Sequence, residues 1–466
     1  MPPLFSWDLG LGRLVGGLAD DIAELSGRAL DNHLNLAVTG LRRSGKTVFI
    51  TSLVHHLIDG HNLPFVAAVH EDRYMGAREI PLHDTRVFPY RQFHHDLDQT
   101  EPNWPAATET LSRLRLLIRA RNPNRLTSTI QPIRELTLDI IDYPGEWLLD
   151  LPLIDETFQS FSEAAFSLAQ TPPRTGVAQE WLAMARSIDQ SSPVDTEVVA
   201  RLSAAFTTYL KTCQRELGLS VIQPGRFTNP GEHAGSELLH FTPLPAAAEV
   251  PGSIRALFRR RFDLYRDEIV KRFYQDHFRR FDRQIVLVDL LSNLNAGAAY
   301  FADTQLALSM ILKSFRYGSS SWLGRLFRPR IGRALFAASK ADHVAPSQHA
   351  ALKQLLELMI RPAARSARLE GVRPEVIALA SLRCTDVVKT THQGQTLSCL
   401  KGRRLGDKEE KIFFPGEIPP ELPEAEDWTE DRFRFYQFEP RRLRTHGDNQ
   451  HIRLDQAIEF LIGDKL

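Results

Sequence analysis

The sequence is poor in cysteine, in net charge and in long apolar runs, and each shortage excludes a class of protein. Three cysteines among 466 residues, Cys213, Cys384 and Cys399, are too few and too scattered for a disulfide framework or a zinc site. The 57 basic residues balance 57 acidic ones, so no bulk charge attracts nucleic acid or anionic lipid. The longest apolar runs, such as 285–291, are far shorter than the about 20 residues of a membrane span.

Two further absences concern the compartment and metals. The N-terminus lacks the basic start and hydrophobic core of a secretory signal, and sparse cysteines suit a reducing compartment, so we expect a cytoplasmic protein. The histidines at 55–56, 83 and 94–95 lack partners at metal-ligand spacing, so we expect no metal beyond Mg²⁺. The length exceeds one ordinary core and predicts two or three domains, or one domain with a large insertion.

The stretch 34–57 organises the chain, and it reads LNLAVTGLRRSGKTVFITSLVHHL. A buried strand precedes a glycine-rich loop, and an apolar-faced helix follows it. Gly40, Gly45, Lys46 and Thr47 match G-x-x-x-x-G-K-[ST], the phosphate-binding P-loop. Glycine lets the chain leave the strand sharply and close on a phosphate, where backbone N–H groups and the helix dipole favour an anion. Lys46 is expected on the β and γ phosphates and the Thr47 hydroxyl on Mg²⁺.

Four more residues of this loop complete the expected nucleotide contacts: Arg42, Arg43, Ser44 and Val48. The two arginines stand where small GTPases often have glycine. Either could contact phosphates and supply part of an arginine finger's charge. Equally, their bulk could obstruct an external activator, or they could point to solvent.

A second motif ends the predicted strand 135–141, where Asp142-Tyr143-Pro144-Gly145 fits D-x-x-G. Asp142 would hold Mg²⁺ through water, and the Gly145 N–H would sense a γ-phosphate and order the next loop. Glu146 follows, where many small GTPases have Gln. It could orient the attacking water, or it could cap the next helix. The expected catalytic set is therefore Lys46, Thr47, Asp142, Gly145 and Glu146, with Thr47 and Asp142 on the metal.

A third motif follows the strand 334–338 as Ser339-Lys340-Ala341-Asp342. It is similar to the [NT]-K-x-D element of GTPases, with Ser in the first position. Asp342 would accept hydrogen bonds from the N1–H and amine of guanine, donors that adenine lacks, and the Lys340 stem would stack on the base. A helix-capping Asp after a strand is the alternative. Ser381, at the end of strand 376–380, stands where GTPases place a backbone N–H on the guanine O6.

The order of these motifs predicts an α/β fold, a Ras-like P-loop NTPase with a mostly parallel sheet and a large helical insertion. Asp142 and Ser339 are 197 residues apart (339 − 142). Two βα units need only about 60 residues. The helical stretch 151–283 accounts for the surplus. The expected divisions are 1–150 and 284–395 for the two parts of the GTPase domain, 151–283 for the insertion and 396–466 for a mixed C-terminal extension.

Several other segments carry expectations. We expect a helix over 11–30, and another over 104–121 with a leucine stripe that arginines interrupt. A long helix from 253 to 281 has an aromatic stripe and many basic residues; we favour a core stripe with a solvated face over a nucleic-acid or lipid-headgroup surface, and treat the arginine-rich loop 325–333 in the same way. The threonine that binds Mg²⁺ from the first switch has three candidates: Thr85, Thr127 and Thr129.

Four blocks carry a family resemblance: GLRRSGKTVFITSLV, DYPGEWLLDLPL, FDRQIVLVDLL and SKADHV. With them the chain resembles the YcjX-like family of bacterial P-loop proteins. The resemblance implies a cytoplasmic GTP-binding protein of stress responses with a Ras-like sheet and a helical insertion.

The leading hypothesis is a regulatory GTPase with GTP or GDP and Mg²⁺ as its cofactors, slow intrinsic hydrolysis and switch output through the insertion. The partners would be guanine nucleotide and an unidentified protein effector, for which the membrane periphery is one setting; nucleic acid is not an expected partner. Two other classes stay open: a nucleotide-binding scaffold with little turnover, and a P-loop ATPase or phosphotransferase. The sequence does not indicate the oligomeric state.

Overall fold

The computed structural model describes residues 32–41, 43–82, 86–106, 110–123, 129, 131–315, 331–369, 371–392, 395–428 and 432–466. The expected helix over 11–30, Arg42, Thr85, Thr127 and most of the loop 325–333 lie outside these residues.

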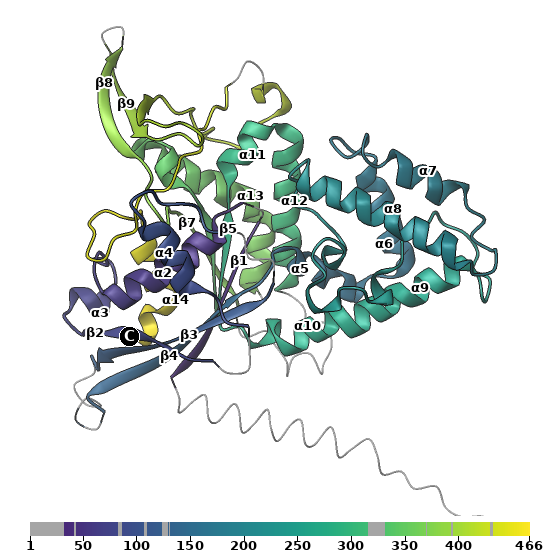
Figure 1. Cartoon of the computed structure of the whole chain (residues 1–466), viewed down its shortest axis with the longest axis horizontal. Coiled ribbons are helices and arrows are strands. Elements are labelled where there is room, and N and C mark those ends of the chain that lie inside the picture. The colour runs from purple at the N-terminus through teal and green to yellow at the C-terminus, as the bar shows by residue number, and fades with distance from the viewer. Residues whose placement is uncertain are drawn as a thin grey trace, which may run out of the picture.

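The architecture centres on a seven-stranded sheet with the order β2-β3-β4-β1-β5-β6-β7 (Figure 1). Its strands are β1 (His33–Gly40), β2 (Tyr74–Ile80), β3 (Ser112–Arg121), β4 (Ile133–Asp142), β5 (Arg283–Val288), β6 (Arg333–Ala338) and β7 (Arg373–Ala378). The five strands β4, β1, β5, β6 and β7 are parallel, and β3 and β2 extend the sheet in antiparallel fashion. The predicted α/β fold with a mostly parallel sheet is confirmed.

Helices cover both faces of the sheet, which explains why the parallel strands are almost continuously apolar. One face packs against α2 (Lys46–Asp59) and α14 (Leu454–Ile462), with Val38, Leu287 and Leu335 in that core. The other face packs against α12 (Ala298–Ser314) and α13 (His349–Leu369). Shorter helices join these layers: α3 (Ala67–His70), α4 (Tyr90–Asp98) and α11 (Leu290–Ala296). The carboxyl ends of the parallel strands meet at one edge, where ligands bind in open α/β sheets.

The helix predicted over 104–121 is wrong, because residues 112–121 form β3. Leu114, Leu116, Ile118 and Ala120 are buried and the residues between them are not, so the apolar period is two rather than 3.6. The arginines that seemed to interrupt a helical stripe are the outward positions of a strand. One of them, Arg115, contacts Asp139 on β4 with its Nε 2.6 Å from Oδ1.

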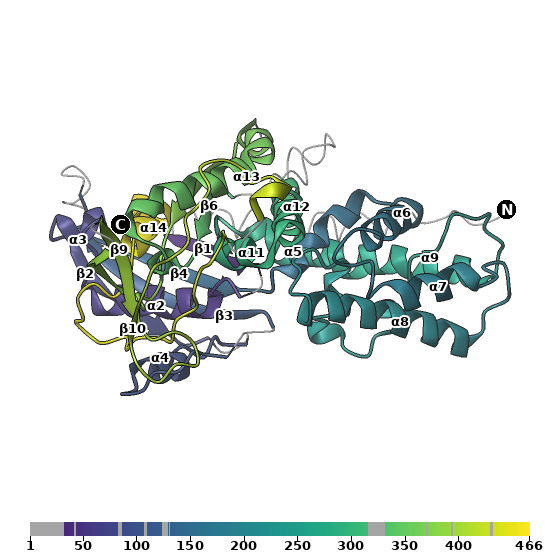
Figure 2. The same cartoon turned by 90° about the horizontal axis from the view of Figure 1, so that it is seen from above.

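The chain between β4 and β5 contains only helical elements, as the predicted helical insertion requires. The main ones are α5 (Glu146–Leu149), α6 (Phe158–Ala169), α7 (Gln179–Ser187), α8 (Thr196–Arg215), α9 (Ile254–Leu264) and α10 (Lys271–Asp276). Figure 2 shows α6 to α9 standing beside the sheet rather than over it. A π-helical turn, Tyr265–Val270, joins α9 to α10, so the predicted long helix is present with a wider turn inside it. None of the helices in the described ranges is long and apolar enough to cross a membrane.

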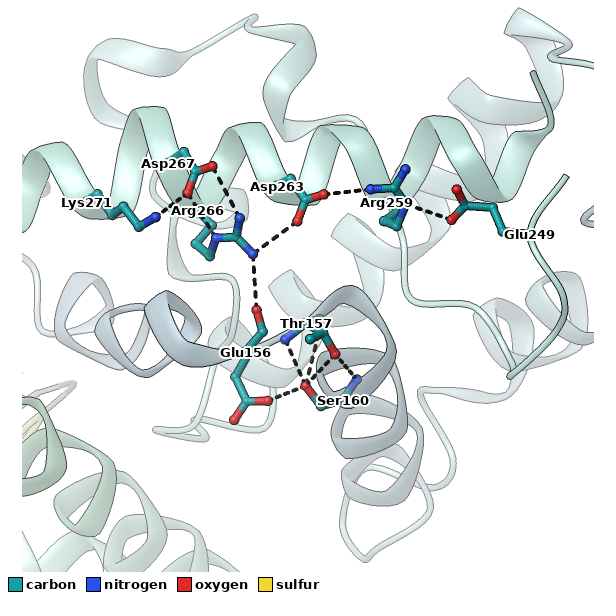
Figure 3. A network of polar contacts seen from close by, with 9 residues as sticks. All are labelled: Glu156, Thr157, Ser160, Glu249, Arg259, Asp263, Arg266, Asp267 and Lys271. Carbon is teal, nitrogen blue, oxygen red and sulfur yellow. Dashed lines mark hydrogen bonds and ion pairs between the residues drawn. The ribbon is translucent and has the colours of Figure 1, made fainter. Parts of the chain in front are cut away.

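The charges on this long helix pair with one another, as Figure 3 shows. Arg259 lies between Glu249 and Asp263, and Lys271 contacts Asp267. Arg266 bonds Asp267 and also donates to the backbone oxygen of Glu156, just before α6. The aromatic stripe of the long helix, including Phe258, Phe262 and Tyr265, is buried. The favoured interpretation, a core stripe with a solvated charged face, is therefore confirmed for the described part of this helix.

The C-terminal region forms a small antiparallel sheet of β8 (Asp386–His392), β9 (Gln395–Gly402) and β10 (Lys411–Phe413), followed by loops and α14. Arg383 N donates to Gln450 O at 2.7 Å, and Ala380 pairs with Ile452, so the chain before α14 lies along the end of β7. The C-terminal residues thereby become part of the sheet edge where the motifs meet.

The strand assignment of residues 112–121 predicts opposite results for two neighbouring substitutions. Leu116 is fully buried, so Leu116→Ala should lower the free energy of unfolding by about 2–5 kcal/mol. Arg119 is half exposed and paired with Glu135, so Arg119→Ala should change it by about 0–1 kcal/mol. Urea denaturation measures both. A helix would place these two residues on one face, and similar losses would contradict the strand.

Candidate nucleotide-binding site

The loop between β1 and α2 has the geometry of an anion cradle. Gly45 lies in the left-handed region, with φ +84°, directly before the first residue of α2. Arg43 also has a positive φ, at 59°. These turns bring backbone N–H groups to the N-terminus of a 14-residue helix, where the helix dipole adds positive potential.

Gly40 has a different role from the sharp exit that we expected. A Cβ on Gly40 would lie 2.2 Å from the Ser44 Oγ, and a Cβ on Gly145 would lie 2.5 Å from the Gly40 carbonyl oxygen. Neither glycine has a positive φ, so close approach rather than backbone freedom requires them. The P-loop and the D-x-x-G loop are therefore in direct backbone contact.

Lys46 and Asp142 form an ion pair at the centre of the site. Lys46 Nζ also donates to the Tyr143 carbonyl at 3.2 Å. Asp142 is 1% exposed and lies behind Lys46, whereas Thr47 lines the cavity. A hydroxyl and a carboxylate at this position are hard oxygen ligands, so the residues fit the expected Mg²⁺. Phosphate binding would require Lys46 to turn from Asp142 toward the cavity.

The loop that we expect to recognise the base follows β6. Lys340 has φ 61°, and its Nζ contacts Asp289 Oδ2 at 2.5 Å and Gln437 Oε1 at 2.8 Å. Burial would raise the pKa of Asp289, but Lys340 and Ser292 hold it below its ordinary value. The Lys340 ammonium group therefore lies at the carboxyl end of β5, which Asp289 follows. Lys340 also lines the cavity.

The side chain of Asp342 has one carboxylate oxygen with a hydrogen bond and one without. Its Oδ2 accepts a hydrogen bond from the Cys384 N–H at 2.7 Å, while its Oδ1 is buried and has no hydrogen-bond partner among the residues that the structure describes. The residue is 3% exposed and lines the cavity. An unpaired buried carboxylate oxygen is costly, so this atom indicates a ligand that donates hydrogen bonds.

One cavity of about 540 Å³ joins these parts. Of the predicted site residues, the cavity wall includes Gly40, Arg43, Ser44, Gly45, Lys46, Thr47, Val48, Gly145, Glu146, Lys340, Asp342 and Ser381. Asp142 lies behind the wall, and Arg42 lies outside the described residues. Thr129 belongs to the β3–β4 connection, while Asp142 ends β4 nine residues after Ile133. The strand is about 30 Å long over this range, so Thr129 lies beyond the end of β4 opposite to Asp142. The structure therefore does not bring this candidate for the first switch to the cavity.

Sequence reasoning missed about a third of the wall. The missed residues that lie away from every motif are Trp104, Pro105, Gln214, Arg215, Thr228, Asn229, Leu405, Gln437 and Phe438. They come from the loop before β3, from the helical insertion and from the C-terminal region, and none lies near a motif in the sequence. Trp104 and Phe438 are joined, since Trp104 Nε1 donates to the Phe438 carbonyl at 3.2 Å.

The helical insertion contacts the D-x-x-G loop through a short set of bonds. Gln214, at the end of α8, donates to Glu146 Oε1 at 2.7 Å. Trp147 Nε1 donates to the Asn229 carbonyl at 3.1 Å, and the Arg226 guanidinium stacks 3.3 Å from the Trp147 ring centre. The carboxylate of Glu146 therefore joins two parts of the site, and it does not cap α5, which begins at Glu146 and has no side-chain cap among the described residues.

A buried carboxylate lies one turn further on. Asp150 accepts from the Gly225 N–H at 2.8 Å and from the Tyr265 hydroxyl at 2.5 Å. Burial raises the pKa of Asp150 to about 6, although the bonds from Tyr265 and Gly225 and the charge of Arg226 oppose the shift. Tyr265 begins the π-helical turn, so Asp150 links the segment after Gly145 to the long helix.

The fold and site define the class of this protein as a Ras-like P-loop nucleotide-binding protein with a helical insertion. The chain belongs to the YcjX-like family, whose model matches residues 34–466. It is 40% identical over 463 residues to an Escherichia coli K12 protein named Ras-like GTPase YcjX, covering 96% of this chain and 99% of that one. A Shewanella oneidensis protein of the same name is 35% identical over 470 residues, covering 94% and 96%. The resemblance predicted from the sequence is confirmed.

The raised pKa of Asp150 predicts a pH-dependent stability. The folded state binds a proton at about pH 6, whereas an unfolded Asp binds it at about 3.9. The free energy of unfolding should therefore fall as pH rises from about 4 to about 6. Asp150→Asn keeps an acceptor for Gly225 and removes this slope.

Urea denaturation at fixed pH values across this range measures the difference between wild type and Asp150→Asn. The exposed Asp155 lies on the same segment, and Asp155→Asn should keep the wild-type slope. A difference between wild type and Asp150→Asn that stays constant from pH 4 to pH 6 would show that Asp150 does not titrate there.

Proposed function

We propose that this chain is a regulatory GTPase that binds GTP and GDP with Mg²⁺, hydrolyses GTP slowly and signals through its helical insertion. The single observation that supports guanine binding best is the unpaired Oδ1 of Asp342 in the cavity wall. Guanine offers N1–H and an exocyclic amine to such an atom, and adenine offers neither at the same edge. A mismatched base would leave the carboxylate buried without a donor.

At the phosphate end, the chain's own residues supply positioning and charge. Lys46 turns to the β and γ phosphates, the N–H groups around Gly45 hold their oxygens, and Thr47 and Asp142 hold the metal. Bound Mg²⁺ would neutralise charge on the phosphates. Arg43, exposed at the mouth of the cavity, is a further cation on this side.

The insertion brings the side chains of Gln214 and Arg215 to the phosphate end of the cavity. Glu146 and Gln214 form a hydrogen-bonded pair in the cavity wall, and they are our candidates for holding the attacking water. Arg215 follows Gln214, is exposed and lines the same cavity. We infer that Arg215 acts as an arginine finger from within the chain, a role the sequence suggested for Arg42 or Arg43.

The switch output follows from the contacts of the segment after Gly145. Glu146, Trp147 and Asp150 all bond to the insertion, so a loop that changes with the γ-phosphate would move α8, the segment around Gly225 and Tyr265 together. We accordingly divide the chain into a GTPase domain, 1–150 with 284–395, a helical insertion, 151–283, and a C-terminal extension, 396–466. We further propose a cytoplasmic location, which the sparse cysteines favour, a role in bacterial stress responses, which the family resemblance implies, and a protein effector.

Guanine specificity is tested by titrating the protein with fluorescent GDP and ADP in Mg²⁺. Wild type should bind GDP tightly and ADP weakly. Asp342→Asn should weaken GDP binding by about thirtyfold or more, because the amide opposes its own donor to the guanine N1–H.

Asp155→Asn removes an exposed carboxylate away from the cavity and serves as the control for charge, with unchanged GDP affinity expected. Equal affinity of wild type for GDP and ADP would refute the guanine site and leave an ATPase or phosphotransferase.

Single-turnover hydrolysis of GTP tests Arg215. Arg215→Ala should slow the chemical step by about tenfold or more with little change in GDP affinity, because the guanidinium acts on charge that develops in the transition state. Arg201 is exposed on the same helix, about 20 Å away, so Arg201→Ala is the matched control and should keep the wild-type rate.

Lys46→Ala should abolish turnover and gives the background. A rate for Arg215→Ala equal to that of wild type would exclude the finger. Wild-type turnover no faster than the background would leave a nucleotide-binding scaffold.

A further inference from the structure

A second cluster of ligating side chains lies at the far end of α2 from the P-loop. The helix ends at Asp59, and Gly60 turns the chain back in the left-handed conformation, with φ 70°. His61 follows, and His446 lies against both from the segment that precedes α14. These three side chains offer two imidazoles and one carboxylate to a single point. Figure 1 shows this C-terminal segment, in yellow, running beside the N-terminal helices.

The distances between the three ligand atoms suit one small ion. His446 Nδ1 lies 3.0 Å from Asp59 Oδ1 and 2.9 Å from His61 Nδ1, and His61 Nδ1 lies 3.8 Å from Asp59 Oδ2. Zinc binds nitrogen and oxygen ligands at about 2.0–2.1 Å, which separates tetrahedral neighbours by about 3.3 Å. The observed separations scatter around this value, so shifts of a few tenths of an ångström would complete the set.

The surrounding backbone orients the ligands. The His446 N–H donates to Asp59 Oδ2 at 3.0 Å, which leaves Oδ1 toward the His446 imidazole. The Asp59 carbonyl accepts from His61 Nδ1 at 2.8 Å, a bond that this nitrogen would give up on binding the ion. Outer hydrogen bonds of this kind fix the ligands of metal sites. His446 also has φ 54°, a conformation that costs a non-glycine residue energy and often marks a functional position. Asn62 and Asn449, in the same two loops, share this conformation.

We propose that Asp59, His61 and His446 bind one divalent transition-metal ion of the zinc class, with water as a further ligand. The carboxylate is buried, whereas the side chains of His61 and His446 are 58% and 64% exposed, so an ion could enter and keep its water. Imidazole and carboxylate ligands suit Zn²⁺ and its neighbours better than Mg²⁺. The site is separate from the nucleotide cavity and does not depend on the proposed GTPase function.

The ion would join α2, the helix that follows the P-loop, to the segment before α14, which bonds to the chain on both sides of Ser381. His55, one turn before Asp59, already contacts the Arg444 carbonyl at 3.2 Å. Four residues after His446, Gln450 and then Ile452 bond to Arg383 and Ala380 beside Ser381. A metal cross-link between residues 385 positions apart should therefore stabilise the folded state.

The test uses the full chain, stripped of transition metals by a chelator and kept in excess Mg²⁺. Co²⁺ titration should give one ion per chain, visible absorption bands of four-coordinate cobalt and displacement by Zn²⁺. Zn²⁺ should also raise the melting temperature. His61→Ala, His446→Ala and Asp59→Asn should each weaken Co²⁺ binding by about a hundredfold and remove the Zn²⁺-dependent rise.

Two histidine variants serve as controls. His70 is exposed on α3, away from the cluster, so His70→Ala should leave Co²⁺ binding unchanged. His94→Ala removes a neighbouring pair, since His94 Nε2 lies 3.0 Å from His55 Nδ1, and should also leave it unchanged.

A far-ultraviolet circular dichroism spectrum and a cooperative thermal transition like those of metal-free wild type would show that the fold of each variant is intact. Absence of Co²⁺ binding to wild type, or binding that survives in both His61→Ala and His446→Ala, would overturn the proposal.

Discussion

The closest backbone contacts in the site are the constraint on which its arrangement depends. A Cβ on Gly145 would lie 2.5 Å from the Gly40 carbonyl, and a Cβ on Gly225 would lie 2.4 Å from the Glu146 carbonyl. P-loop, D-x-x-G loop and insertion therefore follow one another without an intervening side chain. Backbone that packs this closely cannot absorb a displacement in place, so movement of one segment must move the next.

Polar contacts near these glycines also join the segment after Gly145 to the insertion. Gln214 donates a hydrogen bond to Glu146, and Trp147 donates one to Asn229. Asp150 accepts hydrogen bonds from Gly225 and Tyr265. Tyr265 opens a π-helical turn in the long helix, and such turns often occur at functional positions. Beyond it the ion pairs in Figure 3 tie that helix to the start of α6 through Arg266 and Glu156. The segment after Gly145 is thus joined to the insertion at the end of α8, around Gly225 and at Tyr265.

Sequence patterns predicted the parts of the fold whose cause is local. The P-loop, the D-x-x-G segment and the parallel strands were recognisable because spacing and apolar runs follow from the chemistry of single elements. Residues 112–121 were misassigned because leucines at alternate positions, read with Leu111 and Leu117, also satisfy a helical stripe; pairing with β4 decides the matter. The reason for Gly40 was missed as well, since Ser44 and Gly145 approach it only in three dimensions.

The rest of the site depends on distant segments and could not be predicted. In the sequence Arg215 is an ordinary charged residue at the end of an amphipathic helix. Only the fold places it in the wall of the cavity that the P-loop also lines. Asp342 was identified from its motif, but the unpaired state of its Oδ1 requires knowing that Cys384 occupies Oδ2. His61 and His446 are 385 residues apart, so a search for metal spacing passed over both.

Hydrogen exchange of the insertion, compared between the GDP complex and the complex with a non-hydrolysable GTP analogue and Mg²⁺, tests the central claim most directly. The coupling predicts altered exchange at the end of α8 and over residues 225–231, together with the turn at Tyr265. Helix α13, on the sheet face away from α2, supplies the internal reference and should exchange alike in both complexes. An insertion whose exchange is the same in the two nucleotide states would contradict the account.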